Sequence, residues 1–536
     1  MTSRRLRAPR GDGALLADPP LAEAGALLAA NARALAANDH DFQGRRAGRL
    51  RAMARRQALD ASRAFHDRIG LDWPGDPSAG APWVVTGHQP ELFHPGVWVK
   101  NVAVAAIARE GRGVGLNLIV DNDTPKSASV RVPERTARGL KAVPVEFDQW
   151  AGEVPYEDLN ARDPALFASF PARVLERISG QVEDPLIKEF WPLALDAAGR
   201  SDRIGERFAA ARHGIEQRWG VRNYEVPLGL VCETEAFHWF ASHLLAQLPR
   251  YWSVHNAALD RHRASHGIRS RHHPVPALGR EGDWLEAPFW AWRAASPRRR
   301  PLLARQRDPA TLELRIADEP EPFLNLPLGP DREACCAVEV LQMLPEQGIR
   351  LRTRALTTTL FARLLLGDLF LHGIGGAKYD ELGDEVARGF LGAPPPPFLT
   401  LSLTLWLGLP DDPATADSLH AVDQVLRDLD YNPDRHLTSP VATDLETLIR
   451  AKWVAIEAPQ ASHRERVERF RAIRRYNEAL RGAVEGRRND LIRERERLAA
   501  ALRHNQVARS REYPFVLHDR RRLHDAMARA VPGAFC

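Results

Sequence analysis

The chain has 536 residues, of which 44% are hydrophobic and 27% are charged, and its formal net charge is +5. A chain of this length predicts about two to four domains. The ordinary composition excludes disorder over most of the chain, and the small net charge argues against nucleic acid as a partner.

The four cysteines form no CxxC pair, which argues against a disulfide framework and against a cysteine-based zinc site. No apolar stretch is long enough for a secretory signal or for a membrane span. We therefore expect a cytoplasmic protein without a membrane partner.

Helices are predicted over 20–70, where alanine-rich sequence is followed by apolar residues at spacings of three and four. The stretch GLDWPGDPSAGAP then breaks the pattern with glycine and proline. We predict an N-terminal helical region over 1–75, followed by a boundary.

The next segment alternates between strand and helix. PWVVTG (82–87) is typical of a short buried strand, VWVKNVAVAAIARE (97–110) of a helix, and GVGLNLIVDNDT (113–124) of a second strand. This βαβ unit predicts a parallel sheet. We place the α/β core over 76–415, with an inserted α+β region at about 135–330.

Further along, strands are predicted at 283–294 and 311–318, and helix, strand and helix over 334–371. The segment FLTLSLTLWLGL fits either a strand or a helix. From 463 to about 506 the chain is charged, with apolar residues near heptad positions, which predicts a long helix or coiled-coil arm. The third region, 416–536, is predicted to be helical.

The stretch TGHQPELFHPG (86–96) lies between the first strand and helix of the βαβ unit, where α/β sheets bind ligands. The N–H groups at the start of the helix favour an anion, and histidines can contact phosphate oxygens. A capped turn with solvated histidines is the alternative. The candidate residues are Thr86, Gly87, His88, Gln89, His94, Gly96 and Lys100.

Two further stretches offer polar groups. Asp121 and Asp123 end the second strand and could orient an amine, or simply be solvated and cap a turn. Arg352 and Arg354 sit at two-residue spacing on a predicted strand and could bind a carboxylate or phosphate, or face solvent.

The stretch HGIGGAKYDELGDE (372–385) is the other glycine-rich candidate, and it follows a predicted helix that ends at Phe370. Its glycines give backbone N–H groups room to face an anion, although a helix C-cap and a turn fit equally well. It lacks the ending of a P-loop. The candidate residues are His372, Gly373, Gly375, Gly376, Lys378 and Asp380.

Histidines are also frequent over 255–273, but no carboxylate or cysteine lies at zinc-ligand spacing there. We therefore predict no metal site. No GxSxG motif is present, which argues against a serine hydrolase.

VVTGHQPELFHPGVWVKNVAVA, LIVDNDT and HGIGGAKYD, together with the C-terminal helical arm, resemble the bacillithiol biosynthesis cysteine-adding enzymes. His88 stands where that family has glutamine, His94 is extra, and the acidic strand end lacks the family's histidine. The resemblance implies a Rossmann-like core of the HUP/nucleotidyltransferase type with a coiled-coil arm. It also implies a ligase-like enzyme that joins an amino acid such as cysteine to an amine-bearing small molecule.

Forming an amide requires an activated carboxylate, for which ATP with magnesium is the expected cofactor, although the sequence itself leaves the nucleotide and the metal open. On this hypothesis His88, His94 and Lys378 bind phosphates. One alternative is a nucleotidyltransferase that makes an activated sugar or cofactor. Another is a non-catalytic module that binds nucleic acid or protein through its arginine-rich arm, an arm that could also form a homodimer.

Overall fold

The computed structural model describes residues 6–136, 139–459 and 461–535. The described chain forms two compact units. The first, the core unit, comprises the described residues of Met1–Val132, Val143–Leu407 and Arg511–Cys536, and the second, the helical unit, comprises those of Pro133–Ala142 and Gly408–Ser510. The first 75 residues therefore belong to the same unit as the predicted α/β core. Every described helix is too short or too polar to span a lipid bilayer.

The main sheet of the core unit has six strands in the order β1–β14–β13–β2–β3–β6. All neighbouring strands are parallel except β1, which is antiparallel to β14. The strands are β1 (Leu15–Asp18), β2 (Trp83–His88), β3 (Val114–Ile119), β6 (Tyr224–Pro227), β13 (Leu369–His372) and β14 (Leu399–Leu403). The chain runs outward from β2 through β3 to β6, then returns to the other side of β2 as β13. The order thus reverses between β2 and β13.

The predicted βαβ unit is confirmed as β2, α3 (Pro95–Glu110) and β3. Helix α3 packs on β2, β3 and β14 and buries Trp98, Val99 and Val102 completely. On the other face, α2 (Ala47–Ile69) and α8 (Glu235–Ala246) pack in one apolar cluster with β2 and β3. Helices cover both faces of this sheet. The strands β2 and β3 are therefore mostly apolar along their length instead of alternating between apolar and polar residues.

The other helices of the core unit connect these layers. They are α1 (Ala24–Ala36), α4 (Pro164–Arg177), α5 (Ile187–Ala197), α6 (Ile204–Arg218), α7 (Leu228–Val231), α9 (Leu248–His266), α10 (Cys335–Gln342), α11 (Ala355–Phe361), α12 (Ile374–Leu391) and α16 (Arg520–Ala530). Strand β6 belongs to the main sheet although it lies inside the predicted insertion. It is only four residues long, and its partner β3 is distant in sequence.

A second, antiparallel sheet has the order β11–β10–β9–β8–β12, with β7 paired to β8. Its strands are β7 (Arg280–Glu281), β8 (Trp284–Arg293), β9 (Ser296–Asp308), β10 (Thr311–Ile316), β11 (Leu324–Leu326) and β12 (Ile349–Thr353). The predicted strands at 283–294 and 311–318 are confirmed as β8 and β10. We call this element the inserted sheet.

The prediction of a helix that ends at Phe370 is wrong for the second half of that segment. A π-helix over Ala362–Leu366 ends at Gly367, and β13 follows at once. Gly367 lies against the Val85 side chain, where a Cβ would be 3.1 Å from Val85 Cγ2. Apart from Gly367 and Asp368 the run LLLGDLFL is apolar, and such a run fits a buried helix and a buried strand equally well.

The last part of the chain returns to the core unit. Phe515, in the short 3₁₀ helix Phe515–Leu517, is buried and lies within ring contact of Phe93, Trp98 and Phe190. Helix α16 then packs against α3. The core unit is therefore completed by residues that follow the whole helical unit in the sequence.

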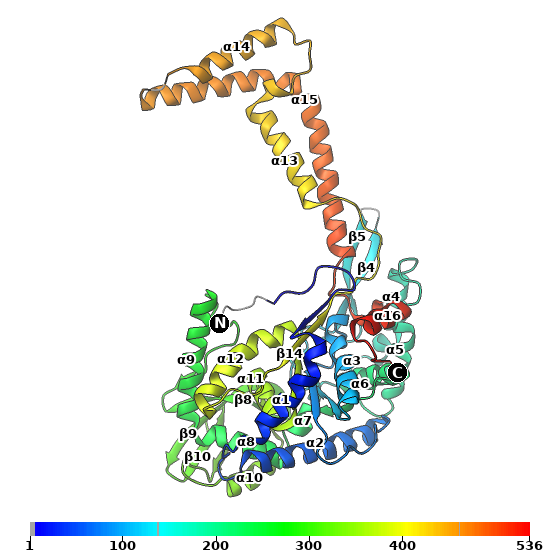
Figure 1. The fold of residues 1–536 in the computed structure, drawn as a ribbon, viewed down its shortest axis with the longest axis vertical. Helices are drawn as coiled ribbons and strands as arrows, with labels where there is room; N and C mark the ends of the chain where they lie inside the picture. Colours follow the sequence, from blue (N-terminus) through cyan, green and yellow to red (C-terminus); the bar gives the residue numbers. More distant parts are fainter. Residues whose placement is uncertain (1–5, 137–138, 460, 536) are drawn as a thin grey trace. The chain divides into compact units, whose positions relative to one another are not determined.

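The helical unit contains α13 (Ala416–Tyr431), α14 (Thr443–Glu457) and α15 (His463–Ala508). The long helix predicted over 463–506 is confirmed as α15. Helices α13 and α14 lie alongside it (Figure 1), and α13 runs antiparallel to it, with ion pairs such as Arg495–Asp423. Strands β4 (Ser129–Thr136) and β5 (Gly139–Glu146) form a two-stranded sheet, and their described residues within Pro133–Ala142 belong to the helical unit.

Candidate functional site

A cavity of about 930 Å³ opens where the strand order of the main sheet reverses. Ligand sites of α/β proteins occur at this position, outside the carboxyl ends of the strands. The predicted residues that line it are Gly87, His88, Gln89, His94, Gly96, Lys100, Asp123, Arg354, His372, Gly373, Gly375, Gly376, Lys378 and Asp380.

The turn after β2 leads directly into α3. His94 is the N-cap of α3, and its Nδ1 accepts a hydrogen bond from the Gly96 N–H at 3.0 Å. Burial, together with the positive charges of Arg511 and Lys100, lowers the pKa of His94 to about 4. His94 is therefore a neutral imidazole at pH 7. Because Nδ1 accepts, Nε2 carries the hydrogen and is the donor.

His88 is held inside the protein. Its Nε2 lies 3.0 Å from Asn101 Oδ1, and its Nδ1 lies 3.1 Å from the Gln89 carbonyl oxygen. Asn101 in turn donates to the buried Glu216. Burial and the nearby Lys100 lower the pKa of His88 to about 3. The lowered pKa values of His88 and His94 mean that neither imidazole adds a positive charge for phosphate at this turn near neutral pH.

Two positive charges lie at this turn, those of Arg511 and of the buried Lys100. Lys100 Nζ donates to the Gly87 carbonyl at 3.0 Å, and no carboxylate pairs with it among the described residues. The residue is 4% exposed, and burial lowers the pKa of Lys100 to about 8. A buried ammonium with one carbonyl partner is costly on its own, and an anion in the cavity would relieve that cost.

The glycine-rich stretch forms a second strand–helix turn rather than a helix C-cap. Gly373 is the N-cap of the 18-residue helix α12 and caps it with no side chain, and Gly373, Ile374 and Gly375 line the cavity. The unsatisfied N–H groups and the positive end of the helix dipole favour an anion there. Lys378 is exposed one turn further along and also lines the cavity.

His372 and Asp380 form a buried pair at the same turn. His372 Nε2 lies 2.7 Å from Asp380 Oδ2, and Asp380 also accepts from Arg363 and Thr359. The positive charges of His372 and Arg363, with these hydrogen bonds, outweigh burial and lower the pKa of Asp380 to about 2. Burial lowers the pKa of His372.

This pairing leaves His372 Nδ1 without a hydrogen-bond partner among the described residues. With Nε2–H donated to Asp380, Nδ1 holds a lone pair and is suited to accept a proton. Gly376 is necessary beside it, because a Cβ there would lie 2.6 Å from Nδ1. The individual residues were predicted, but the pairing was not. It depends on β13 being a strand that opens onto α12.

The inserted sheet supplies the opposite wall. Trp290 lies between two arginines, with Arg354 4.0 Å and Arg299 5.3 Å from its ring centre. Arg354 pairs with Glu286, and Arg299 pairs with Asp123 at 2.8 Å. Apolar residues extend this wall: Tyr251, Val275, Leu278 and Pro288. Neither Arg299 nor Trp290 was among the residues predicted from the sequence.

Three predicted residues do not line the cavity. Thr86 is buried and donates to the Leu371 carbonyl. Asp121 accepts from the Gly229 N–H at 2.7 Å, and burial beside Glu157 raises its pKa well above the ordinary range. The prediction that Asp121 orients an amine at the site is therefore wrong, because Asp121 does not line the cavity.

Arg352 is the third of these residues. It is 2% exposed and binds Glu157 through three hydrogen bonds, with a further bond to Glu233 at 2.8 Å. Arg354 lies beyond the end of β12 as the N-cap of α11, so the two-residue alternation of a strand does not apply to the pair. Of the two arginines, only Arg354 can contact a ligand in the cavity.

No protein-family model matches the chain, and no curated protein matches it.

Proposed function

We propose that the protein is a ligase-like enzyme that uses ATP to join an amino acid to an amine-bearing small molecule. One observation carries the proposal: the adjacent strands β2 and β13 each end at a helix N-terminus in one cavity, next to Lys100 and Lys378. The strand order corresponds to 3-2-1-4-5, the order of doubly wound nucleotide-binding sheets. This order supports a Rossmann-like core.

The phosphates of ATP, with magnesium bound to them, fit the positive end of the cavity. The uncapped N–H groups at the start of α12 would hold phosphate oxygens, and Lys100, on α3, would stabilise the charge that develops as the carboxylate attacks phosphorus. The products of this step are an acyl-adenylate and pyrophosphate, or an acyl phosphate and ADP.

The second step needs a base and a place for the other substrate. His372 Nδ1, oriented by Asp380, would take the proton of the attacking amine. Arg354 and the Trp290 wall offer a cationic and aromatic surface for the organic part of a substrate. The resemblance to the bacillithiol biosynthesis enzymes suggests cysteine as the amino acid.

Replacing Lys378 with Ala is expected to weaken ATP binding about tenfold, because it removes one exposed charge near the phosphates. Isothermal titration calorimetry with ATP and magnesium measures this. Lys188→Ala, an exposed lysine on α5, is the matched control and should bind like the wild type. Equal ATP affinity in the wild type and Lys378→Ala would place the phosphates elsewhere.

A turnover assay then separates the two enzyme classes. Pyrophosphate or ADP release that requires an amino acid supports the ligase. Pyrophosphate release with a sugar phosphate and no amino acid would instead indicate the nucleotidyltransferase that we consider as the alternative.

We also propose that the helical unit forms a homodimer. Trp453, Val454 and Phe470 are large apolar residues that are 43%, 70% and 62% exposed. Val454→Glu is expected to shift the protein from dimer to monomer in light scattering, since a charge would be buried in the interface. Thr447→Glu, on the same helix, is the control. A wild type that is monomeric at high concentration contradicts this proposal.

A further inference from the structure

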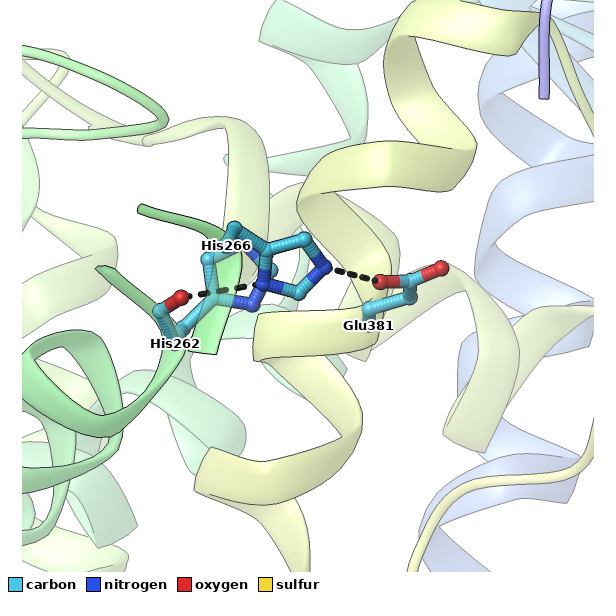
Figure 2. Close-up of side chains that lie close together, drawn as sticks. All are labelled: His262, His266 and Glu381. Carbon is cyan, nitrogen blue, oxygen red and sulfur yellow. Dashed lines mark hydrogen bonds and ion pairs between the residues drawn. The ribbon is translucent and has the colours of Figure 1, made fainter. Parts of the chain in front are cut away.

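Two helices that line the cavity also bring three metal-ligating side chains together on their outer side. His262 and His266 are one turn apart on α9, and Glu381 comes from α12 (Figure 2). The ligand atoms all lie within 4.8 Å of one another. The sequence could not predict this cluster, because Glu381 is far from the histidines along the chain. None of the three residues lines the cavity.

The hydrogen bonds of His266 fix which of its nitrogens can bind a cation. Nδ1 lies 2.9 Å from the His262 carbonyl oxygen and 3.0 Å from Ser265 Oγ, and Ser265 Oγ itself donates to that carbonyl. Because a carbonyl only accepts, Nδ1 carries the hydrogen. Metal-binding histidines usually have this arrangement.

In the neutral imidazole, Nε2 of His266 therefore has a lone pair, and it faces Glu381 Oε2 at 3.6 Å (Figure 2). A lone pair that faces a carboxylate is repulsive unless a cation lies between them. A proton on His266 or a metal ion between the two groups removes this repulsion.

His262 favours the metal over the proton. It is 5% exposed and stacks on His266, with ring centres 4.2 Å apart, and its ring nitrogens have no hydrogen-bond partner among the described residues. An imidazole nitrogen that no protein group occupies is available to a cation. A proton on His266 satisfies one imidazole and the carboxylate, whereas a metal ion also satisfies His262. Glu385, one turn after Glu381, adds negative charge near His262.

We propose that His262, His266 and Glu381 bind a divalent transition metal ion of the zinc type, with water or Glu385 at the fourth position. Zinc bonds of about 2.0–2.1 Å place tetrahedral ligand atoms about 3.3 Å apart. The side chains would close inward by roughly 1.5 Å for the widest pair, and histidines four apart on a helix are suited to this. Two imidazoles and a carboxylate are ligands that zinc accepts.

The metal would have a structural role at the cavity. Helix α9 supplies Tyr251 and His255 to the cavity wall, and α12 supplies the glycine-rich N-terminus and Lys378. An ion held by both helices fixes one wall against the other. The proposed metal site therefore takes no part in the proposed ATP chemistry. Its existence does not depend on the proposed function.

The test uses the full-length protein, stripped of metal with a chelator and then dialysed against zinc chloride. We expect about one zinc per chain by mass spectrometry of the metal, and cobalt absorption bands of a tetrahedral site after cobalt replacement. The His262→Asn/His266→Asn double variant and Glu381→Gln are expected to bind at least tenfold more weakly. His420→Asn, an exposed histidine on α13, should bind like the wild type.

Equal zinc content in the wild type and the double variant, or no retained zinc in either, would overturn the proposal. Circular dichroism establishes whether the variants fold. The thermal midpoint of the wild type provides a test without any variant, since an ion that binds only the folded state raises it. A midpoint that zinc does not change would overturn the proposal as well.

Discussion

Replacing Lys100 with Met is expected to make the folded protein more stable and to remove ATP binding. The pKa of Lys100 is about 8 instead of the ordinary 10.5, because burial disfavours its charge. This difference corresponds to about 3 kcal/mol of lost stability at pH 7. Met keeps the apolar stem and loses a hydrogen bond to Gly87 worth about 1 kcal/mol. We expect a net gain of about 2 kcal/mol.

The direction in which stability changes with pH follows from the number of protons that the folded and the unfolded protein bind. Between pH 8 and 10.5 the unfolded chain holds the Lys100 proton and the folded protein releases it, so wild-type stability rises with pH across this window. The advantage of Lys100→Met should therefore be full below pH 8 and shrink towards pH 10.5. Urea unfolding of both proteins at pH 7 and pH 10 measures the difference.

Two results would contradict this prediction. A less stable Lys100→Met variant would show that the charge is compensated in the folded protein. Unchanged ATP affinity in calorimetry would show that phosphates do not reach Lys100. Lys188→Met is the control for adding a methionine at an exposed position.

Replacing Arg212 with Met is expected to destabilise the protein by roughly 3–5 kcal/mol. Its guanidinium lies 2.7 Å from Glu216 Oε2 and 2.7 Å from Glu225 Oε2, and all three side chains are at most 3% exposed. Removing the arginine leaves two carboxylates buried without their partner. Glu216 also accepts from Asn101, which contacts His88, so the turn after β2 should lose its support.

Urea unfolding measures this loss, and Arg218→Met is the control. Arg218 is on the same helix and pairs with Glu189, but its side chain is 52% exposed. Exposed pairs contribute about 0–1 kcal/mol, so the control should lose little. Equal losses of unfolding free energy in both variants would contradict the prediction. They would mean that the buried ion pairs of Arg212 stabilise the protein no more than the exposed pair of Arg218 does.

The acid side of stability should change in the Arg212 variant as well. Arg212 and His213 hold the pKa of Glu225 below its ordinary value of 4.5, despite burial. The stability from this group is present above pH 4.5 and is lost as pH falls through the folded pKa. Arg212→Met should lack this acid-dependent decline.

Local patterns predicted the first part of the site well. The run from β2 through α3 to β3 is contiguous, its apolar segments are separated by glycine, and its parallel pairing follows from the short crossover. The sequence alone therefore predicts that the turn before α3, with His94, lies at the carboxyl edge of a sheet.

The second part of the site depended on pairing between distant segments. β13 is only four residues long, and its identity comes from hydrogen bonding to β2 and β14. Without it, the glycine-rich stretch could be assigned only to a turn. Asp121 and Arg352 were misplaced for a related reason, since their buried partners Gly229 and Glu157 come from other parts of the chain.

The return of the chain to the core unit after α15 has a consequence for biosynthesis. A nascent chain that has been translated through the helical unit still lacks Phe515 and α16, which pack against Trp98 and α3. The aromatic cluster around Trp98 stays open to solvent until 511–535 has left the ribosome. The surface that these residues cover on α3 and α5 therefore stays exposed while more than a hundred later residues are made. Chaperones that shield such surfaces would act on this protein late in its synthesis.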